Sequence, residues 1–136
     1  MNDLFALHPI GVVRNTGSAA WLEVEEKYRA AMFGLEGFSH ILVLFWFHEN
    51  DTPELRATLQ VRPRKDPKNP LTGVFATHSP LRPNLIGLTR CRILAIEEMV
   101  IRLDAIDARD GSPLVDIKCF IPDKEPVADI RLPHWV

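Results

Sequence analysis

The alternation of apolar and polar residues along the chain predicts a protein built mainly of short β-strands. Three segments show this period of two: residues 21–25, 88–96 and 99–106. The last two flank Glu97 and Glu98, as the arms of a hairpin flank its turn. Residues 5–14 are interpreted as a first strand, with Pro9 near an edge or bulge. A final strand is expected at residues 114–121, after a turn at residues 110–113, and one short helix at residues 27–35, where apolar residues recur at helical spacing.

Residues 41–47 break the alternation because all seven are apolar. Such a run predicts a strand buried on both faces, with one face in the core and the other in a subunit contact. Further strands are expected at residues 55–61 and 74–76, and residues 62–70, with three prolines and four basic residues, are expected to form an extended loop. Many short strands with frequent Pro and Gly predict an all-β fold whose single sheet curls or closes.

Composition favours one globular domain spanning residues 1–136. The chain is 46% hydrophobic and 25% charged, and its longest apolar run has seven residues, too few to span a bilayer. The N-terminus lacks the basic start and long apolar stretch of a secretion signal, which predicts a cytoplasmic protein. Cys91 and Cys119 are interpreted as reduced and structural, although a disulfide stays open, and neither they nor the five histidines show metal-ligand spacing.

Charge is distributed unevenly along the chain. Between Arg56 and Arg92 eight basic residues face one acid, so this sector carries +7 while the remainder carries −9. Such a sector would attract a polyanion and position phosphates. A solvated basic surface, balanced by acids elsewhere in the fold, is the alternative that the sequence leaves open.

The stretch at residues 73–84 combines apolar residues with His78, Ser79, Arg82 and Asn84. Pro80 and Pro83 fix their φ angles, so these polar groups are expected on a stiff turn, which is a plausible site. The chain contains neither a Gly-x-Gly-x-x-Gly fingerprint nor a Walker-type phosphate loop. A nucleoside cofactor would therefore have to bind on strand ends and loops of a β fold.

The two halves of this stretch, Gly-Val-Phe-Ala-Thr and Arg-Pro-Asn, resemble the signature of the TsaA-like family, the TrmO-type tRNA methyltransferases that use S-adenosylmethionine. Further motifs follow in the family's order: Pro9-Ile10-Gly11, Gly37-Phe38-Ser39-His40, Arg62-Pro63-Arg64, Ile86-Gly87-Leu88, Asp110-Gly111 and Asp116-Ile117-Lys118. The resemblance runs from about residue 8 to about residue 122. It implies a single-sheeted β-barrel, a homodimer, and N6-methylation of threonylcarbamoyl-adenosine beside a tRNA anticodon.

Methyl transfer from a sulfonium needs alignment of the acceptor and removal of a proton more than covalent catalysis, so a binding constellation is expected. The resemblance implies that Asp116 is the catalytic residue, whereas its spacing alone favours an exposed strand residue paired with Lys118. The resemblance implies cofactor contacts from ten residues: His48, Glu49, His78, Arg82, Asn84, Leu88, Asp116, Ile117, Lys118 and Cys119. For His48 and Glu49, an ordinary strand end in solvent is the alternative.

The candidates for tRNA phosphate contacts are Arg62, Arg64, Lys65 and Lys68, with a flexible solvated loop as the alternative. Three positions beside the expected pocket depart from the family pattern: His78 replaces an arginine, Leu85 a proline, and Cys119-Phe120 a Pro-Tyr pair. These departures motivate a second hypothesis, a non-catalytic sensor of S-adenosylmethionine or a related nucleoside. A third is an RNA-binding module that takes no cofactor.

Overall fold

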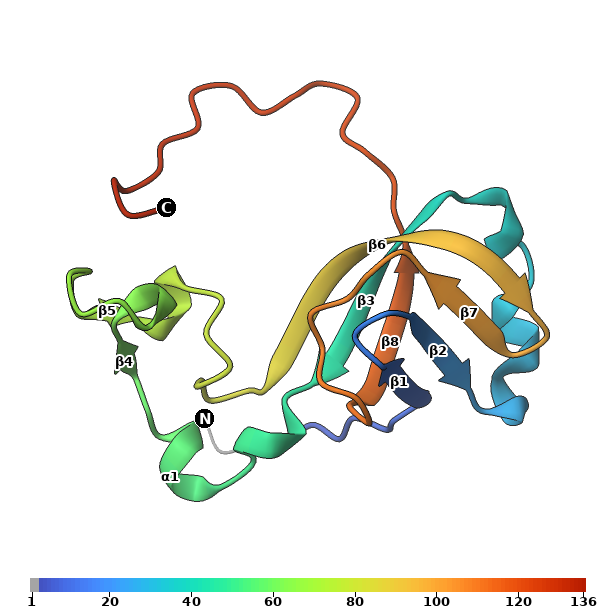
Figure 1. Ribbon diagram of the computed structural model, residues 1–136, viewed down its shortest axis with the longest axis horizontal. Coiled ribbons are helices and arrows are strands. Elements are labelled where there is room, and N and C mark those ends of the chain that lie inside the picture. The colour runs from blue at the N-terminus through green and yellow to red at the C-terminus, as the bar shows by residue number, and fades with distance from the viewer. Residues whose placement is uncertain (1–2) are drawn as a thin grey trace. The chain divides into compact units, whose positions relative to one another are not determined.

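The computed structural model describes residues 3–136 and divides into two compact units. The barrel unit comprises the chain up to Glu49 together with Ile86–Phe120, and the second unit comprises Asn50–Leu85 together with Ile121–Val136. Each unit has its own secondary structure (Figure 1). The prediction of a single domain for residues 1–136 stays a prediction.

Six antiparallel strands form the barrel unit: β1 (Gly11–Asn15), β2 (Ala20–Val24), β3 (His40–Trp46), β6 (Ile86–Glu97), β7 (Val100–Leu103) and β8 (Pro113–Cys119). Their order is β1-β2-β7-β6-β3-β8, and β8 also pairs with β1, so the sheet closes on itself. Figure 1 shows β6 curving alongside β3 and β7, its two partners. The predicted all-β fold with one closed sheet is confirmed.

The core of the barrel is made by the inward residues of the alternating strands. Those with no exposed surface are Val13, Leu22, Ile41, Val43, Ile101 and Leu114. In β3 the inward residues are buried and the outward residues Leu42, Leu44 and Trp46 are half-buried. The predicted apolar strand is confirmed, its outer face is only partly covered within the single chain, and its contact with another subunit stays a prediction.

The glycines of two motifs allow close approach between strands. A Cβ at Gly11 would collide with the main-chain oxygen of Glu23 on β2. A Cβ at Gly87 would lie 2.5 Å from the nearest ring carbon of Phe45, its partner on β3. Tight packing therefore explains why both positions carry glycine.

The predicted hairpin around Glu97 and Glu98 is confirmed by β6 and β7, and the final strand by β8. The first strand, predicted at residues 5–14, begins only at Gly11. Residues 3–9 are exposed and do not pair with any strand of the sheet. The predicted helix at residues 27–35 is instead two 3₁₀ helices, η1 (Glu26–Met32) and η2 (Leu35–Gly37). Tyr28 leaves the helical conformation, so a regular α-helix does not continue through it.

The second unit contains short elements: α1 (Pro53–Arg56), β4 (Gln60–Val61), η4 (Pro63–Lys65), β5 (Thr72–Gly73) and η5 (Val74–Ala76). The predicted strand at residues 55–61 is wrong except for Gln60 and Val61. Its first residues belong to α1, which begins with Pro53 and is capped by Thr52, whose Oγ1 accepts a hydrogen bond from the N–H of Leu55 at 3.2 Å.

The predicted strand at residues 74–76 is also wrong. Val74 is buried whereas Phe75 is 84% exposed. The main-chain N–H and the hydroxyl of Thr77 both donate to the Val74 oxygen, at 3.1 and 2.8 Å, and close a 3₁₀ turn. Local hydrogen bonds therefore satisfy this segment without a strand partner.

Both cysteines are free, as predicted. Cys91 on β6 and Cys119 on β8 align with Ile41 from opposite sides, so all of β3 lies between them. Two strand spacings, about 9–10 Å, exceed the reach of a disulfide. The disulfide that the sequence left open is thereby excluded.

Candidate functional site

A pocket of about 500 Å³ opens in the barrel unit. Its volume falls in the range of small-molecule sites. The lining comes from β8 and from residues that precede β3: Ile10, Val24, Tyr28, Ala31, Met32, Phe33, Gly34, Leu35, Phe38, Asp116, Ile117 and Cys119. Asp116 carries the one charge in a lining that is otherwise mostly apolar.

Strand β8 brings three predicted site residues into this pocket, namely Asp116, Ile117 and Cys119. Ile117 and Cys119 align with the buried residues Val43 and Ile41, and so lie on the inner face of the sheet. Asp116 lies on β8 between the inward-facing residues Leu114 and Ile117, and its own side chain is exposed. Its Oδ1 accepts a hydrogen bond from the Ile117 N–H at 2.8 Å. The pocket thus has an apolar floor with a carboxylate at its rim.

One main-chain edge of β8 is unpaired beside the pocket. Strand β1 pairs with β8 only through Pro113 and Leu114, whereas β3 pairs with it as far as Cys119. Beyond Leu114, the edge of β8 that faced β1 has no strand partner among the described residues 3–136. Unpaired N–H and C=O groups at a pocket can hold the polar parts of a ligand.

The opposite wall, residues 26–38, was not identified as part of a site from the sequence. Tyr28, Met32 and Leu35 pack against the barrel core and line the pocket as well, whereas Phe33 is 92% exposed. The available signal was the helical spacing of these apolar residues, which indicates burial but not the presence of a cavity. We call residues 26–38 the pocket wall.

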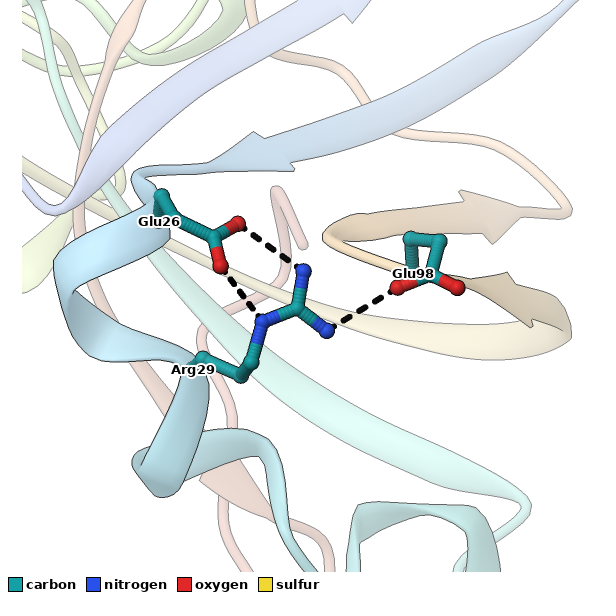
Figure 2. Close-up of polar contacts among 3 residues, drawn as sticks. All are labelled: Glu26, Arg29 and Glu98. Carbon is teal, nitrogen blue, oxygen red and sulfur yellow. Dashed lines mark hydrogen bonds and ion pairs between the residues drawn. The ribbon is translucent and has the colours of Figure 1, made fainter.

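An ionic cluster ties the pocket wall to the β6–β7 turn (Figure 2). The Arg29 guanidinium donates to both carboxylate oxygens of Glu26, at 2.5 and 2.9 Å, and to Glu98 Oε2 at 2.9 Å. Hydrogen bonds to Glu26 and Glu98 raise the pKa of Arg29, and the bond from Arg29 lowers the pKa of Glu26. Arg29 and Glu26 are therefore held in their charged forms.

Leu88 and Lys118, two other predicted cofactor residues, lie on the outer face of the sheet. Leu88 and Asp116 align with Leu44 from opposite sides, and Lys118 aligns with Leu42. His48 and Glu49 are exposed in the 3₁₀ helix η3 (His48–Asn50), where Glu49 lies 3.7 Å from Arg109. None of these four residues lines the pocket, and among them only Lys118 is next in sequence to lining residues, namely Ile117 and Cys119.

The predicted stiff turn is present in the second unit. The Arg82 guanidinium donates to the main-chain oxygens of Thr77 and Ser79 at 3.2 and 3.0 Å, while the Ser79 N–H bonds to Thr77 Oγ1 at 3.1 Å. Arg82 therefore holds the turn together. His78 and Asn84 are exposed, and these three candidates are not among the residues that line the pocket of the barrel unit.

The four candidate RNA contacts lie on a compact loop, which corrects the prediction of an extended one. Arg62 Nη1 donates to the Asn69 oxygen at 2.9 Å, and Asn69 Nδ2 donates to the Pro63 oxygen at 2.8 Å. Arg64 and Lys65 both adopt left-handed conformations, with φ of 59° and 56°. We call residues 62–69 the basic loop; its four cations, Arg62, Arg64, Lys65 and Lys68, are exposed.

Within residues 3–136, no group of three or more His, Cys, Asp and Glu side chains is arranged to hold a metal ion. The same residues contain no helix that is long and apolar enough to cross a membrane.

Sequence comparison identifies related proteins over most of the chain. A probable S-adenosyl-L-methionine-binding protein of Pyrococcus horikoshii is 43% identical over 118 residues, which cover 87% of this chain and 84% of the relative. A probable S-adenosyl-L-methionine-binding protein of Methanocaldococcus jannaschii is 44% identical, with coverage of 86% and 93%. The tRNA (adenine(37)-N6)-methyltransferase of Escherichia coli is 35% identical, covering 88% of this chain but 52% of that protein.

Solved structures support the same relationship. The chain matches a crystal structure of TrmO with a TM-score of 0.72 and 32% identity, over 96% of this chain and 64% of that one. TrmO from Pseudomonas aeruginosa matches with a TM-score of 0.71 and 29% identity, over 95% and 61%. The chain thus spans less than two thirds of these solved chains. Residues 7–125 match the model of the tRNA-methyltransferase O N-terminal domain, and the chain therefore belongs to this family, as its resemblance to the TsaA-like proteins predicted.

Proposed function

We propose that the protein is an S-adenosylmethionine-dependent tRNA methyltransferase that modifies N6 of threonylcarbamoyl-adenosine beside the anticodon, and that it works as a cytoplasmic homodimer. The observation that carries the proposal is the pocket at β8, where Asp116, Ile117 and Cys119 meet an apolar wall and an unpaired strand edge. The relatives support it through their names, which refer to S-adenosylmethionine binding and to tRNA adenine-37 N6 methylation.

The lining fits the cofactor's chemistry. The apolar side chains would take the adenine, and the free main-chain groups of β8 would hold the cofactor's polar end. When bound, S-adenosylmethionine supplies a methyl group activated by a cationic sulfonium. The carboxylate of Asp116 would stabilise that positive charge and accept the proton released by the acceptor nitrogen.

The basic loop is the proposed contact for tRNA phosphates. Its internal hydrogen bonds hold Arg62, Arg64, Lys65 and Lys68 on a short, constrained segment. A cationic segment that is already ordered loses less conformational entropy on binding RNA than a flexible loop does. His78 and Arg82, on the stiff turn of the same unit, are proposed as additional contacts to the cofactor or the RNA.

The proposed homodimer would cover the outer face of β3 and β6. One end of this face is apolar, since the half-buried Leu44 and Trp46 lie beside Leu88 and Ile86, which are 62% and 39% exposed. Its other end carries the exposed Arg90 and Arg92. Leu88→Lys is expected to yield a monomer in light scattering. Leu94→Lys is the matched control because Leu94 is 61% exposed on the same strand, away from β3. A dimer that survives Leu88→Lys would contradict this interface.

Nucleoside mass spectrometry tests the activity. We compare tRNA from cells that contain the protein, lack it, or carry Asp116→Asn. The methylated threonylcarbamoyl-adenosine should disappear in the second and third samples. Identical levels in all three would refute the methyltransferase proposal for that tRNA pool and favour the nucleoside sensor, provided that S-adenosylmethionine still binds in titration calorimetry.

Thiol alkylation tests the pocket independently. Cys119 lines the pocket, whereas Cys91 is 1% exposed and its burial raises its pKa to about 12. Bound S-adenosylmethionine should slow the alkylation of Cys119, while Cys91 stays unreactive as the internal control. An unchanged rate at Cys119 under saturating cofactor would place the cofactor site elsewhere.

A further inference from the structure

The pocket wall is weakly fixed by its own secondary structure. Residues 26–38 consist of two short 3₁₀ helices with a non-helical residue at Tyr28, and neither helix contains a buried residue. Only a few half-buried side chains, among them Tyr28 and Met32, pack against the barrel. Segments with few buried contacts open more readily than the elements they pack on.

The hairpin of β6 and β7, by contrast, is a firm anchor. Its strands pair from Ile93 to Glu97 and from Val100 to Leu103, and Glu98 stands at the turn with φ of 55°. Arg29 joins the wall to this turn across 69 residues of sequence. Figure 2 shows its guanidinium between Glu26, on the wall itself, and Glu98 on the hairpin.

We propose that Arg29 is a positioning residue for the cofactor: by bridging Glu26 and Glu98 it holds the pocket wall in the conformation that binds S-adenosylmethionine. This proposal rests on the proposed function of the pocket. Arg29 does not line the pocket, so it acts through its neighbours Tyr28, Ala31 and Met32, which do.

The bridge from Arg29 to Glu26 and Glu98 raises the fraction of molecules in which the pocket wall is in its cofactor-binding conformation. Apparent affinity falls in proportion to the fraction of molecules whose wall is in place. The bridge is exposed, with 53% of the Arg29 side chain and 82% of the Glu98 side chain accessible, so salt screens it. Raising the ionic strength should therefore weaken cofactor binding by wild-type protein more than by a protein that lacks the bridge.

The experiment compares Arg29→Ala, Arg29→Lys and Glu98→Gln with wild type. The matched control is Arg102→Ala, because Arg102 lies on the same hairpin, is 50% exposed and pairs with Glu97 at 3.4 Å without touching the wall. Dissociation constants for S-adenosylmethionine are measured by calorimetry at low and high salt. Alkylation of Cys119 and Cys91 is measured without cofactor.

Arg29→Ala and Glu98→Gln should weaken binding roughly two- to fivefold, as expected for loss of an exposed ion pair, and should lose most of the salt dependence. Arg29→Lys should bind S-adenosylmethionine more tightly than Arg29→Ala, because the positive charge is kept. It should bind less tightly than wild type, because one ammonium cannot bond to Glu26 and Glu98 as the guanidinium does. Cys119 should become more reactive in both bridge-breaking variants, with Cys91 unchanged, which separates a displaced wall from general unfolding. Arg102→Ala should match wild type throughout.

The proposal is overturned if Arg29→Ala binds like wild type, or if Arg102→Ala weakens binding equally. Equal rises in the reactivity of Cys91 and Cys119 would also refute it, because they would indicate a loosened barrel. Wild-type protein that binds no S-adenosylmethionine would refute the proposed function. In that case the reactivity of Cys119 in cofactor-free protein still decides whether Arg29 holds the wall.

Discussion

Replacing Gly87 by alanine should destabilise the barrel through one identifiable collision. The new Cβ would stand 2.5, 2.6 and 2.9 Å from three carbons of the Phe45 ring. Ordinary contact begins at 3.4 Å, so the ring must retreat by about 1 Å. Phe45 is 3% exposed and packs edge-on against Phe47, with ring centroids 5.4 Å apart, so there is little room for this movement.

The magnitude follows from two opposing effects. Overpacking a core costs about 1–3 kcal/mol, and the reduced freedom of alanine in the unfolded chain offsets about 0.4–1 kcal/mol. The free energy of unfolding should therefore fall by about 1–2 kcal/mol, which lowers Tm by roughly 4–8 °C for a chain of this size.

A double-mutant cycle with Phe45→Leu checks the reason for the loss. Leucine lacks the ring carbons that meet the new Cβ, so Gly87→Ala should cost little in the Phe45→Leu background. Urea unfolding measures all four proteins. Gly73→Ala is the control, because a Cβ there would find its nearest neighbour at 4.0 Å. Equal losses from Gly87→Ala in the two backgrounds, or none in either, would refute the collision.

Three further predictions concern pH and salt. Burial, with the charges of Asp104 and nearby Asp107, raises the Cys91 pKa from 9.0 to about 12, so the stabilising contribution of the protonated thiol is present below pH 9 and lost as pH rises toward 12. In urea unfolding, the free energy of unfolding should fall over this pH range in wild type by more than it does in Cys91→Ala. Desolvation raises the Asp104 pKa, but main-chain N–H donors outweigh it and the net pKa is lowered, so stability should fall in wild type, and less in Asp104→Asn, as pH drops below 3.8. Replacing both Arg64 and Lys65 by asparagine, which tolerates their left-handed backbone, should reduce the slope of log affinity for tRNA against log salt concentration by about 1.5. An unchanged slope would mean that the basic loop does not contact tRNA phosphates.

Much of the barrel could be predicted because its signal is local. Strands β2, β3, β6, β7 and β8 were recognised from alternation or from an apolar run. In the barrel unit the first strand was predicted too long, and the predicted helix is two 3₁₀ helices. The two wrong strand predictions fall in the second unit, where short apolar segments close hydrogen bonds within themselves, as Val74 and Thr77 do. Periodicity reports which residues avoid water, but it does not distinguish a strand partner from a turn.

The site was predictable only in part, and for the same reason. Family resemblance identified Asp116, Ile117 and Cys119, which the structure brings into one pocket. It did not identify the pocket wall, whose apolar residues look like ordinary core in the sequence. Arg29 had no detectable signal, because its partner Glu98 lies 69 residues away.

The sequence by itself determined the class of fold, the inner face of most barrel strands and the family, because these depend on neighbours two to four residues apart and on short ordered motifs. The tertiary structure decided the rest. It set β8 against β3 with one edge free, left Ile41 between the two cysteines, and bridged the pocket wall to a distant hairpin turn. The physical reason is that strand register and long-range ion pairs depend on which distant segments meet, and no local pattern records that choice.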